Sequence, residues 1–340
     1  MASILADFHH HDLYEAHQLV FVDRFGWDLC RPIGMEWFEE RYWSFGQEIL
    51  GDLLARQYLA IWSNDTDCGD HWERQDPNHP GRHYKMVTLE QARARHWDFV
   101  LSSVSENDDG LHRFAREVGA RWITYIGNQG QLIRWDLNPL AIVSARIELP
   151  HPERAAVVHQ EFSLRDFRYE RPVRRSRVGS FVPCFPTTPP YATFLELARS
   201  MPDFDWRVHG PYGDAPPDEF RAGIIETTPG VAAAMRGIGF IWHTKLADGF
   251  GHVIHNAFAC GRPVVGSMTP YVGKTAEPLW IDGVTCIDID RRSQDEVRQL
   301  MREIRDDPER HLRMCEAAAA RFREMVDFDG DAEKIRELLT

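Results

Sequence analysis

The side chains with the clearest capacity for chemistry lie between Lys245 and Asn256. Asp248 stands at the mouth of the turn Gly249-Phe250-Gly251, where its carboxylate can accept hydrogen bonds from hydroxyl groups. Lys245 lies three residues earlier, and a lysine beside a helix N-terminus can neutralise the charge that develops on a leaving phosphate. Asn256 follows Asp248 by eight residues, about two helical turns, so it lies on roughly the same side of a helix.

The surrounding sequence predicts a strand, the turn, a helix and a second strand. The apolar run Phe240–Trp242 predicts a buried strand, and residues 262–266 predict another. From His252 the apolar residues recur at helical spacing, and Gly261 is placed to end that helix. The N-terminus of such a helix offers unpaired N–H groups and a partial positive charge. A glycine turn at this point therefore predicts an anion-binding site.

Three blocks of this region resemble one family of enzymes. The blocks D-G-F-G, H-N-A-F-A-C-G-R-P-V-V and I-D-G-V-T-C occur in the order and at the separations seen in the donor half of retaining GT-B glycosyltransferases. The resemblance implies an α/β fold in which two doubly wound Rossmann-like domains face a cleft. It also implies a nucleotide-sugar donor as co-substrate, retention of anomeric configuration, no metal and no cofactor. The alternative is an ordinary βαβ unit whose glycine turn only connects its elements.

The same resemblance implies roles for individual residues. The family's paired carboxylates correspond to Asp248, which is one methylene shorter than the usual glutamate, and to Asn256, which lacks the charge. Asp248 is expected to bind hydroxyl groups of the donor sugar, and the N–H groups of Gly249, Phe250 and Gly251 to hold sugar or phosphate. Asn256 is expected to hold the ribose, because an amide can pair with a diol.

The family's diphosphate clamp is replaced in this chain. Ser180 stands where relatives have arginine, and Pro189 stands near the position of their lysine. Lys245 and Lys274 are the available replacements, and the alternative for each is a plain surface lysine.

Two further residues end predicted strands of the same half. Gly210 corresponds to a glycine that lies near the nucleotide base in relatives. His243 ends the strand before the turn, and ligands of doubly wound sheets bind at carboxyl ends of strands. Both are expected to contact the donor.

A histidine cluster follows the first predicted strand, Ser3–Phe8, and three interpretations of it stay open. His10 and His11 could face the cleft as a general base, with Asp12 as a polar ligand of the substrate, because histidine titrates near neutral pH. His9, His11 and Asp12 could instead bind a metal, which would indicate a metal-dependent hydrolase. The cluster could also be an inert loop.

The periodicity and the resemblance together predict the domain organisation. Residues 1–167 are expected to form the acceptor-side domain, 168–177 the linker, and 178–325 the donor domain. Residues 326–340 are expected to form a helix that packs back on the first domain. In the first domain Asn128 occupies a turn where relatives place a cleft residue. The segment 64–83 is expected to be a loop, because it has no apolar period.

Composition limits the remaining possibilities. The net charge of −13 counts against a protein dominated by contacts to nucleic-acid phosphates, although a local basic cleft stays open. The six cysteines are scattered without metal spacing, which indicates reduced thiols and a cytoplasmic protein. No apolar run is long enough to span a membrane. The acceptor stays unidentified, and the alternatives include a macromolecule, such as a hydroxylated DNA base or a protein, and a non-catalytic nucleotide-sugar binder.

Overall fold

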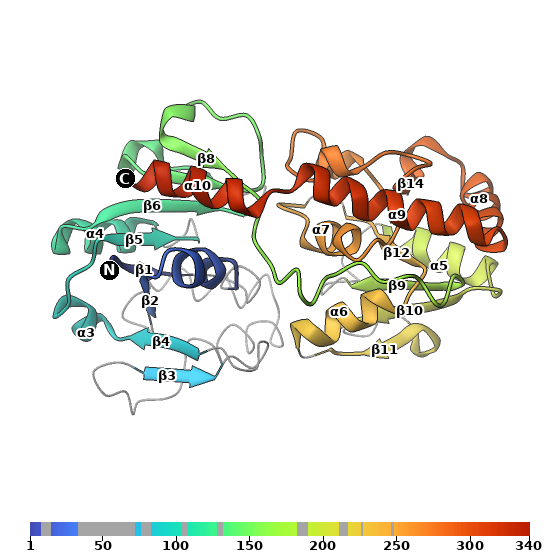
Figure 1. Ribbon diagram of the computed structural model, residues 1–340, viewed down its shortest axis with the longest axis horizontal. Coiled ribbons are helices and arrows are strands. Elements are labelled where there is room, and N and C mark those ends of the chain that lie inside the picture. The colour runs from blue at the N-terminus through green and yellow to red at the C-terminus, as the bar shows by residue number, and fades with distance from the viewer. Residues whose placement is uncertain are drawn as a thin grey trace. The chain divides into compact units, whose positions relative to one another are not determined.

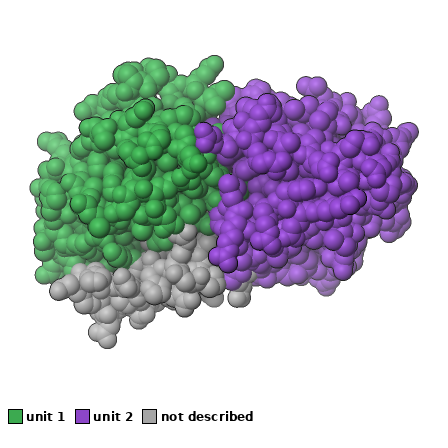
Figure 2. All heavy atoms as spheres, in the orientation of Figure 1, with its two compact units in different colours: residues 1–162, 328–340 green, residues 163–327 purple. Residues whose placement is uncertain are grey.

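The computed structural model describes residues 1–7, 15–32, 72–75, 83–103, 108–127, 132–181, 190–210, 217–225, 227–245 and 248–340. The chain divides into two compact units (Figure 2). Unit 1 comprises Met1–Phe162 and Phe328–Thr340, and unit 2 comprises Ser163–Asp327. Among the described helices, none is long and apolar enough to cross a bilayer.

Unit 1 is built on a sheet that has eight strands within its described residues. In spatial order the strands are β3 (Trp72–Gln75), β4 (His83–Val87), β2 (Asp28–Pro32), β1 (Ser3–Ala6), β5 (Phe99–Ser102), β6 (Arg121–Ile126), β7 (Leu140–Val143) and β8 (Ala155–Val157). All neighbouring pairs are parallel except β3 with β4. The helices described in this unit are a π-helical segment at Gln18–Arg24, α3 (Leu89–Arg93), α4 (Asp108–Val118) and α10 (Phe328–Leu339).

The strands of unit 1 alternate apolar side chains between two cores, one on each face of the sheet. Ile4 of β1 and Leu101 of β5 belong to a core that also contains Val20 and Phe21 of the π-helical segment. Leu5 and Val100 belong to the opposite core, together with side chains of α3 and α4. Burial on both faces explains why these strands read as continuous apolar runs.

The last helix of the chain, α10, completes the first of these cores. Ile335 and Leu339 are buried in it, and α10 packs against β7 and β8 (Figure 1). Asp331 of α10 accepts hydrogen bonds from the backbone N–H and ring Nδ1 of His159, at 2.9 and 2.7 Å. Unit 1 is therefore assembled from two segments that are separated by the whole of unit 2.

Unit 2 carries a parallel sheet of six strands among its described residues. Their spatial order is β11 (Arg221–Gly223), β10 (Asp205–His209), β9 (Arg177–Phe181), β12 (Phe240–His243), β13 (Val264–Gly266) and β14 (Cys286–Asp288). The accompanying helices are α5 (Pro190–Ser200), α6 (Thr228–Arg236), α7 (His252–Ala259), α8 (Gln294–Asp306) and α9 (Pro308–Met325). One core packs the sheet against α5 and α8, through residues such as Trp206, Trp242 and Met301.

Arg262, between α7 and β13, is fully buried in unit 2, where backbone carbonyls hold its guanidinium. Its nitrogens donate to the carbonyls of Met235, Arg236, Gly261 and Glu170, at 2.7–3.2 Å. These bonds compensate for the loss of hydration of a buried charge. The bonds to Glu170 and Arg236 also connect the chain segment around Glu170 to the C-terminal end of α6.

One expectation about unit 1 was wrong. The segment 64–83 was expected to be a loop, but Trp72–Gln75 forms β3 and pairs antiparallel with β4, with Trp72 opposite Met86 and Gln75 opposite His83. A strand of four mostly polar residues at the edge of a sheet has no apolar run to reveal it. Its backbone pairing depends on a neighbouring strand that the local sequence does not show.

Candidate active site

The candidate site lies at the carboxyl edge of the unit 2 sheet, where β12 ends and α7 begins. The strand Phe240–His243 is completely buried and parallel to both neighbours, β9 and β13. Gly266 of β13 lies opposite His243, and a Cβ at Gly266 would stand only 1.9 Å from the carbonyl oxygen of His243. Glycine at this position therefore allows the two strands to approach at the edge that carries the site.

Helix α7 has well-defined ends. Gly251 is its N-cap, with a φ of +81° that favours glycine, and a Cβ there would lie 2.8 Å from Cε1 of Tyr271. At the other end Gly261 has a φ of +65° and donates to the carbonyl of Phe258, while Arg262 donates to that of Ala257. This pair of bonds is a Schellman motif, so Gly261 ends the helix as expected.

The carboxylate of Asp248 accepts hydrogen bonds from four donors. Its Oδ1 accepts from Lys245 Nζ at 3.1 Å and from the Gly249 N–H at 2.9 Å. Its Oδ2 accepts from His243 Nε2 at 3.2 Å and from the hydroxyl of Tyr271 at 2.7 Å. An ionised carboxylate has about four acceptor positions, so the protein itself occupies the acceptor capacity of Asp248.

The charge state of this cluster follows from its contacts. Burial opposes ionisation of Asp248, but the hydrogen bond from His243 and the charge of Lys245 outweigh it and hold the pKa of the carboxyl below its usual range. Burial lowers the pKa of His243, which is fully buried, against the raising effect of Asp248. Burial and the adjacent Asp248 raise the pKa of Tyr271. The cluster therefore combines an ionised aspartate, a neutral histidine and a protonated tyrosine.

Both candidate lysines contact Asp248. Lys245 reaches the carboxylate, whereas Lys274 donates to the backbone carbonyl of Asp248 and is 6% exposed. Lys274 is thus not the freely solvated surface lysine that was its alternative interpretation. Because Asp248 is ionised, the two ammonium groups leave one net positive charge next to the N-terminus of α7.

Asn256 lies on one side of α7 with its amide oxygen buried. It is 9% exposed, and its Oδ1 has no hydrogen-bond partner among the described residues. The Nδ1 of His243 and the Oγ of Ser180 are also buried without a partner in the part of the chain that the structure describes. Unpaired buried acceptors are unfavourable, and a ligand that donates hydroxyl groups would satisfy them.

Gly210 follows β10, at the same edge of the sheet. It has a φ of +134°, and its N–H donates to the carbonyl of Gly223 at 3.3 Å. The preceding residue, His209, stacks on Phe181 at the end of β9, with ring centroids 4.8 Å apart. Gly210 and His243 therefore lie at the carboxyl ends of β10 and β12, between which β9 lies in the sheet, and their contact with a donor stays a prediction.

Several predicted site residues lie outside the described residues. These are His9, His10, His11, Asp12 and Asn128. Their predicted roles stay predictions. Among the described residues there is no group of three histidine, cysteine, aspartate or glutamate side chains arranged to hold a metal ion.

Tyr271 is the member of the site that sequence reasoning missed. It is fully buried and stacks on Trp280, with ring centroids 5.4 Å apart. It follows Asp248 by 23 residues, in a short 3-10 helix at Thr269–Tyr271. No local pattern marks it, because only the return of the chain after β13 brings its hydroxyl to the aspartate.

Two doubly wound sheets, parallel except for the β3–β4 pair, with a glycine turn at the carboxyl edge of the second sheet, define the GT-B class of fold. Solved structures of GT-B glycosyltransferases match the whole chain, at identities that establish the fold alone. No protein-family model matches the sequence, and no curated protein matches it.

Three of these solved structures illustrate the similarity. HepE (Alr3699) from Anabaena in complex with UDP has a TM-score of 0.65 and 12% identity, over 100% of this chain and 99% of that one. Sucrose-phosphate synthase from Thermosynechococcus elongatus has a TM-score of 0.64 and 11% identity, over 99% and 98%. An alpha-glucosyltransferase in complex with UDP and a 13-mer DNA has a TM-score of 0.63 and 10% identity, over 100% and 99%.

Proposed function

We propose that this chain is a glycosyltransferase that moves a sugar from a nucleotide-sugar donor to an acceptor hydroxyl. The observation that carries the proposal is the cluster around Asp248, which holds Lys245 and Lys274 beside the N-terminus of α7 at the carboxyl edge of a doubly wound sheet. Such an edge is where open α/β sheets bind ligands, and such a helix terminus favours anions. The fold shared with nucleotide-sugar enzymes supports the same function.

In the proposed reaction the two lysines bind the donor diphosphate and stabilise the charge on the leaving phosphate. When the donor binds, the ammonium group of Lys245 leaves the carboxylate of Asp248 and contacts the phosphate instead. This exchange frees an acceptor position on Oδ1, which then takes a hydroxyl of the donor sugar. The bonds from His243 and Tyr271 keep the carboxylate ionised and oriented during the exchange.

The turn and α7 supply the remaining donor contacts. From the resemblance, Gly249, Phe250 and Gly251 are the turn residues proposed to bind sugar or phosphate, and the Gly249 N–H donates to Asp248 before any ligand binds. The buried Oδ1 of Asn256, which has no partner among the described residues, is proposed to accept a hydrogen bond from a ribose hydroxyl, and Gly210 is proposed to adjoin the base. The buried Nδ1 of His243 is likewise proposed to accept a hydrogen bond from a hydroxyl group of the donor.

Retention and metal independence follow from the resemblance, whereas the roles of the histidines and Asp12 follow from their position after the first strand and from their chemistry. We propose retention of configuration, no metal requirement, and an acceptor bound by unit 1, where His10 or His11 acts as base and Asp12 and Asn128 bind the substrate. The four cysteines that the structure describes as free are buried, and burial raises the pKa of the Cys30 thiol to about 11. Inert thiols of this kind fit a cytoplasmic enzyme.

A panel of nucleotides and nucleotide sugars, screened by thermal shift with and without EDTA, tests the donor site. A ligand that binds only the folded state raises the melting temperature. We expect stabilisation by one nucleoside-diphosphate family, unaffected by EDTA, and slow hydrolysis of its sugar conjugate. Lys245→Gln should weaken the shift, whereas Arg323→Gln, an exposed change on α9, should not. No shift with any nucleotide, together with destabilisation by EDTA, would reject the proposal in favour of a metal-dependent enzyme.

A further inference from the structure

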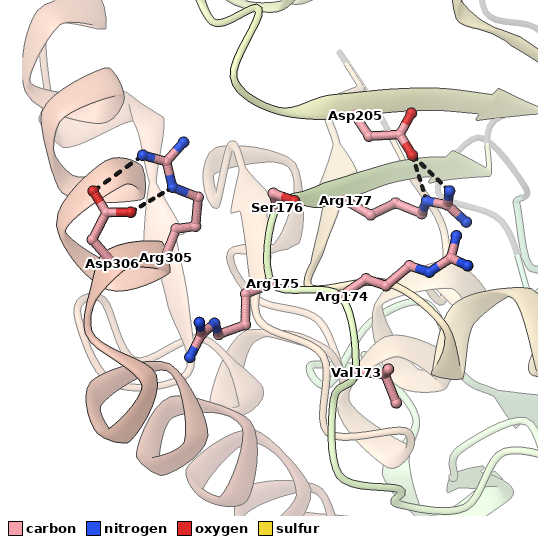
Figure 3. A pocket seen from close by; sticks show the side chains of 8 residues that line it. All are labelled: Val173, Arg174, Arg175, Ser176, Arg177, Asp205, Arg305 and Asp306. Atoms are coloured by element: carbon pink, nitrogen blue, oxygen red, sulfur yellow. Dashed lines mark hydrogen bonds and ion pairs between the residues drawn. The ribbon is translucent and has the colours of Figure 1, made fainter.

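A pocket of about 500 Å³ lies at the edge of the unit 2 sheet opposite to the Asp248 cluster (Figure 3). It is lined by Val173–Arg177, which lead into and begin β9, by Asp205 at the start of β10, and by Arg305 and Asp306 at the end of α8. Strands β9, β10 and β12 are parallel, so their amino ends share one edge. The pocket is therefore separated from the Asp248 cluster by the length of the strands. We call it the arginine pocket.

The arginine pocket has more positive than negative charge. Arg177 Nε donates to Asp205 at 2.7 Å, and Arg305 Nε donates to Asp306 at 2.7 Å, so each lining carboxylate is already bound. The side chains of Arg174 and Arg175 have no carboxylate within ion-pair distance among the described residues. Two guanidinium groups thus stand outside any such ion pair on the wall of a pocket, in a chain of net charge −13.

The arginines lie on two sides of the pocket. Figure 3 shows Arg174 and Arg177 extending in one direction and Arg175 in the opposite direction, on the side of Arg305. A guanidinium presents a planar fork of N–H donors that matches phosphate oxygens in pairs. A ligand with one phosphate can bind the arginines on only one side of the pocket, whereas a ligand with two phosphates can bind arginines on both sides.

We propose that the arginine pocket is a second ligand site, which binds a small molecule carrying two phosphate groups. Its volume falls within the range of about 300 to 1,000 Å³ that is usual for small-ligand sites. The net charge of −13 disfavours binding of a long polyanion. The proposal stands on this pocket alone and does not depend on sugar transfer at Asp248.

Isothermal titration with inorganic pyrophosphate at constant ionic strength tests this site in the full chain. Wild-type protein should bind pyrophosphate more tightly than inorganic orthophosphate. The double variant Arg174→Gln/Arg175→Gln should lose about tenfold or more in pyrophosphate affinity, because charge-assisted bonds to both of these arginines are removed. Arg174→Lys/Arg175→Lys keeps the charges without the forks and should lose less.

Two controls separate this site from general charge effects and from the donor site. Arg313→Gln/Arg323→Gln removes the same charge from exposed positions on α9 and should leave the affinity within about twofold. Lys245→Gln removes a charge from the proposed donor-diphosphate site, so the titrations are also run in this background, where pyrophosphate binding to the arginine pocket should persist. Equal loss in the α9 variant, absence of pyrophosphate binding in the Lys245→Gln background, or equal affinity for orthophosphate would overturn the proposal. Binding of a DNA oligonucleotide without binding of pyrophosphate would overturn it as well.

Discussion

At the scale of single residues, Asp248 is the centre of the candidate site because four donors from different positions meet on its carboxylate. The donors are Lys245, the Gly249 N–H, His243 and Tyr271. A carboxylate held in this way is ionised and fixed in orientation before any ligand arrives. Its first effect is to position the groups around it, and contact with substrate requires one of them to move.

Replacement of Asp248 by asparagine tests this role. The amide is neutral and keeps a single acceptor oxygen, so two or more of the four donors lose their partner. We expect sugar transfer to fall by about 100-fold or more, and the free energy of unfolding by about 1–3 kcal/mol. Enzyme assays and denaturant titration measure the two effects.

The matched change Asp295→Asn, at a side chain that is 89% exposed on α8, should alter neither quantity appreciably. Tyr271→Phe removes one donor and keeps the buried ring, so it should cause a smaller loss of transfer than Asp248→Asn. Wild-type transfer by Asp248→Asn would contradict the assignment of the site.

At the scale of elements, the turn before α7 depends on glycine for two separate reasons. Gly251 has a positive φ, and the ring of Tyr271 occupies the space next to its missing Cβ. Close contact between the turn and Tyr271 is also what brings the tyrosine hydroxyl to Asp248.

Gly251→Ala should therefore destabilise unit 2 by about 1–3 kcal/mol, through backbone strain and the clash with Tyr271. Gly283→Ala provides the control, because Gly283 has a φ of +76° but none of the described residues places an atom within 4 Å of where its Cβ would stand. The control should show the strain alone, and urea unfolding of both variants gives the difference. Equal destabilisation would mean that the contact with Tyr271 contributes nothing.

The elements of this chain were largely predictable where the sequence carries a local signal. Parallel strands buried on both faces read as apolar runs, and the helix that Gly261 ends shows its C-cap in sequence. The edge strand β3 has no such signal, since its pairing with β4 is set by tertiary structure. Tyr271 was not predicted for the same reason, because its role depends on a contact with Asp248, which lies 23 residues earlier in the chain. Asp248 was predictable from the resemblance, whereas Lys245 and Lys274 were predicted only as candidate replacements for the missing diphosphate clamp.

At the scale of the whole molecule, α10 contributes to the stability of unit 1 although it follows unit 2 in sequence. Ile335 is 4% exposed in the core that contains β1, β5 and β6. Ile335→Ala should lower the free energy of unfolding of unit 1 by about 2–5 kcal/mol, because it leaves a cavity. Glu337→Ala, on the exposed side of the same helix, should stay within about 0.5 kcal/mol of wild type. Hydrogen exchange of β7 and β8 would locate the effect, and protection unchanged by Ile335→Ala would contradict it.

The stability of the protein should also fall at acidic pH. Burial lowers the pKa of His311 from 6.5 to about 4, against the hydrogen bond to the Gly239 carbonyl at 3.0 Å. The folded state therefore binds a proton less readily than the unfolded state. The stabilisation is fully present above pH 6.5 and is lost as the pH falls towards 4.

This residue alone can account for up to about 3 kcal/mol, and the lowered pKa of His243 acts with the same sign. Denaturant titrations between pH 4 and 7.5 in wild type and His311→Gln measure the effect, with the exposed His96→Gln as control. A pH dependence that persists unchanged in His311→Gln would assign it to other groups.

The return of α10 to unit 1 also affects how the protein is made. Unit 2 is one continuous stretch, so all of its core has been synthesised once Asp327 has left the ribosome. Unit 1 begins first but still lacks Ile335 and Leu339 at that time. The first-translated unit is thus the last that can close its core, and its sheet must wait through the synthesis of unit 2 with one face incompletely covered. A nascent chain stalled before Phe328 would carry a finished unit 2 and an unfinished unit 1, which makes that exposed face a natural point of chaperone contact.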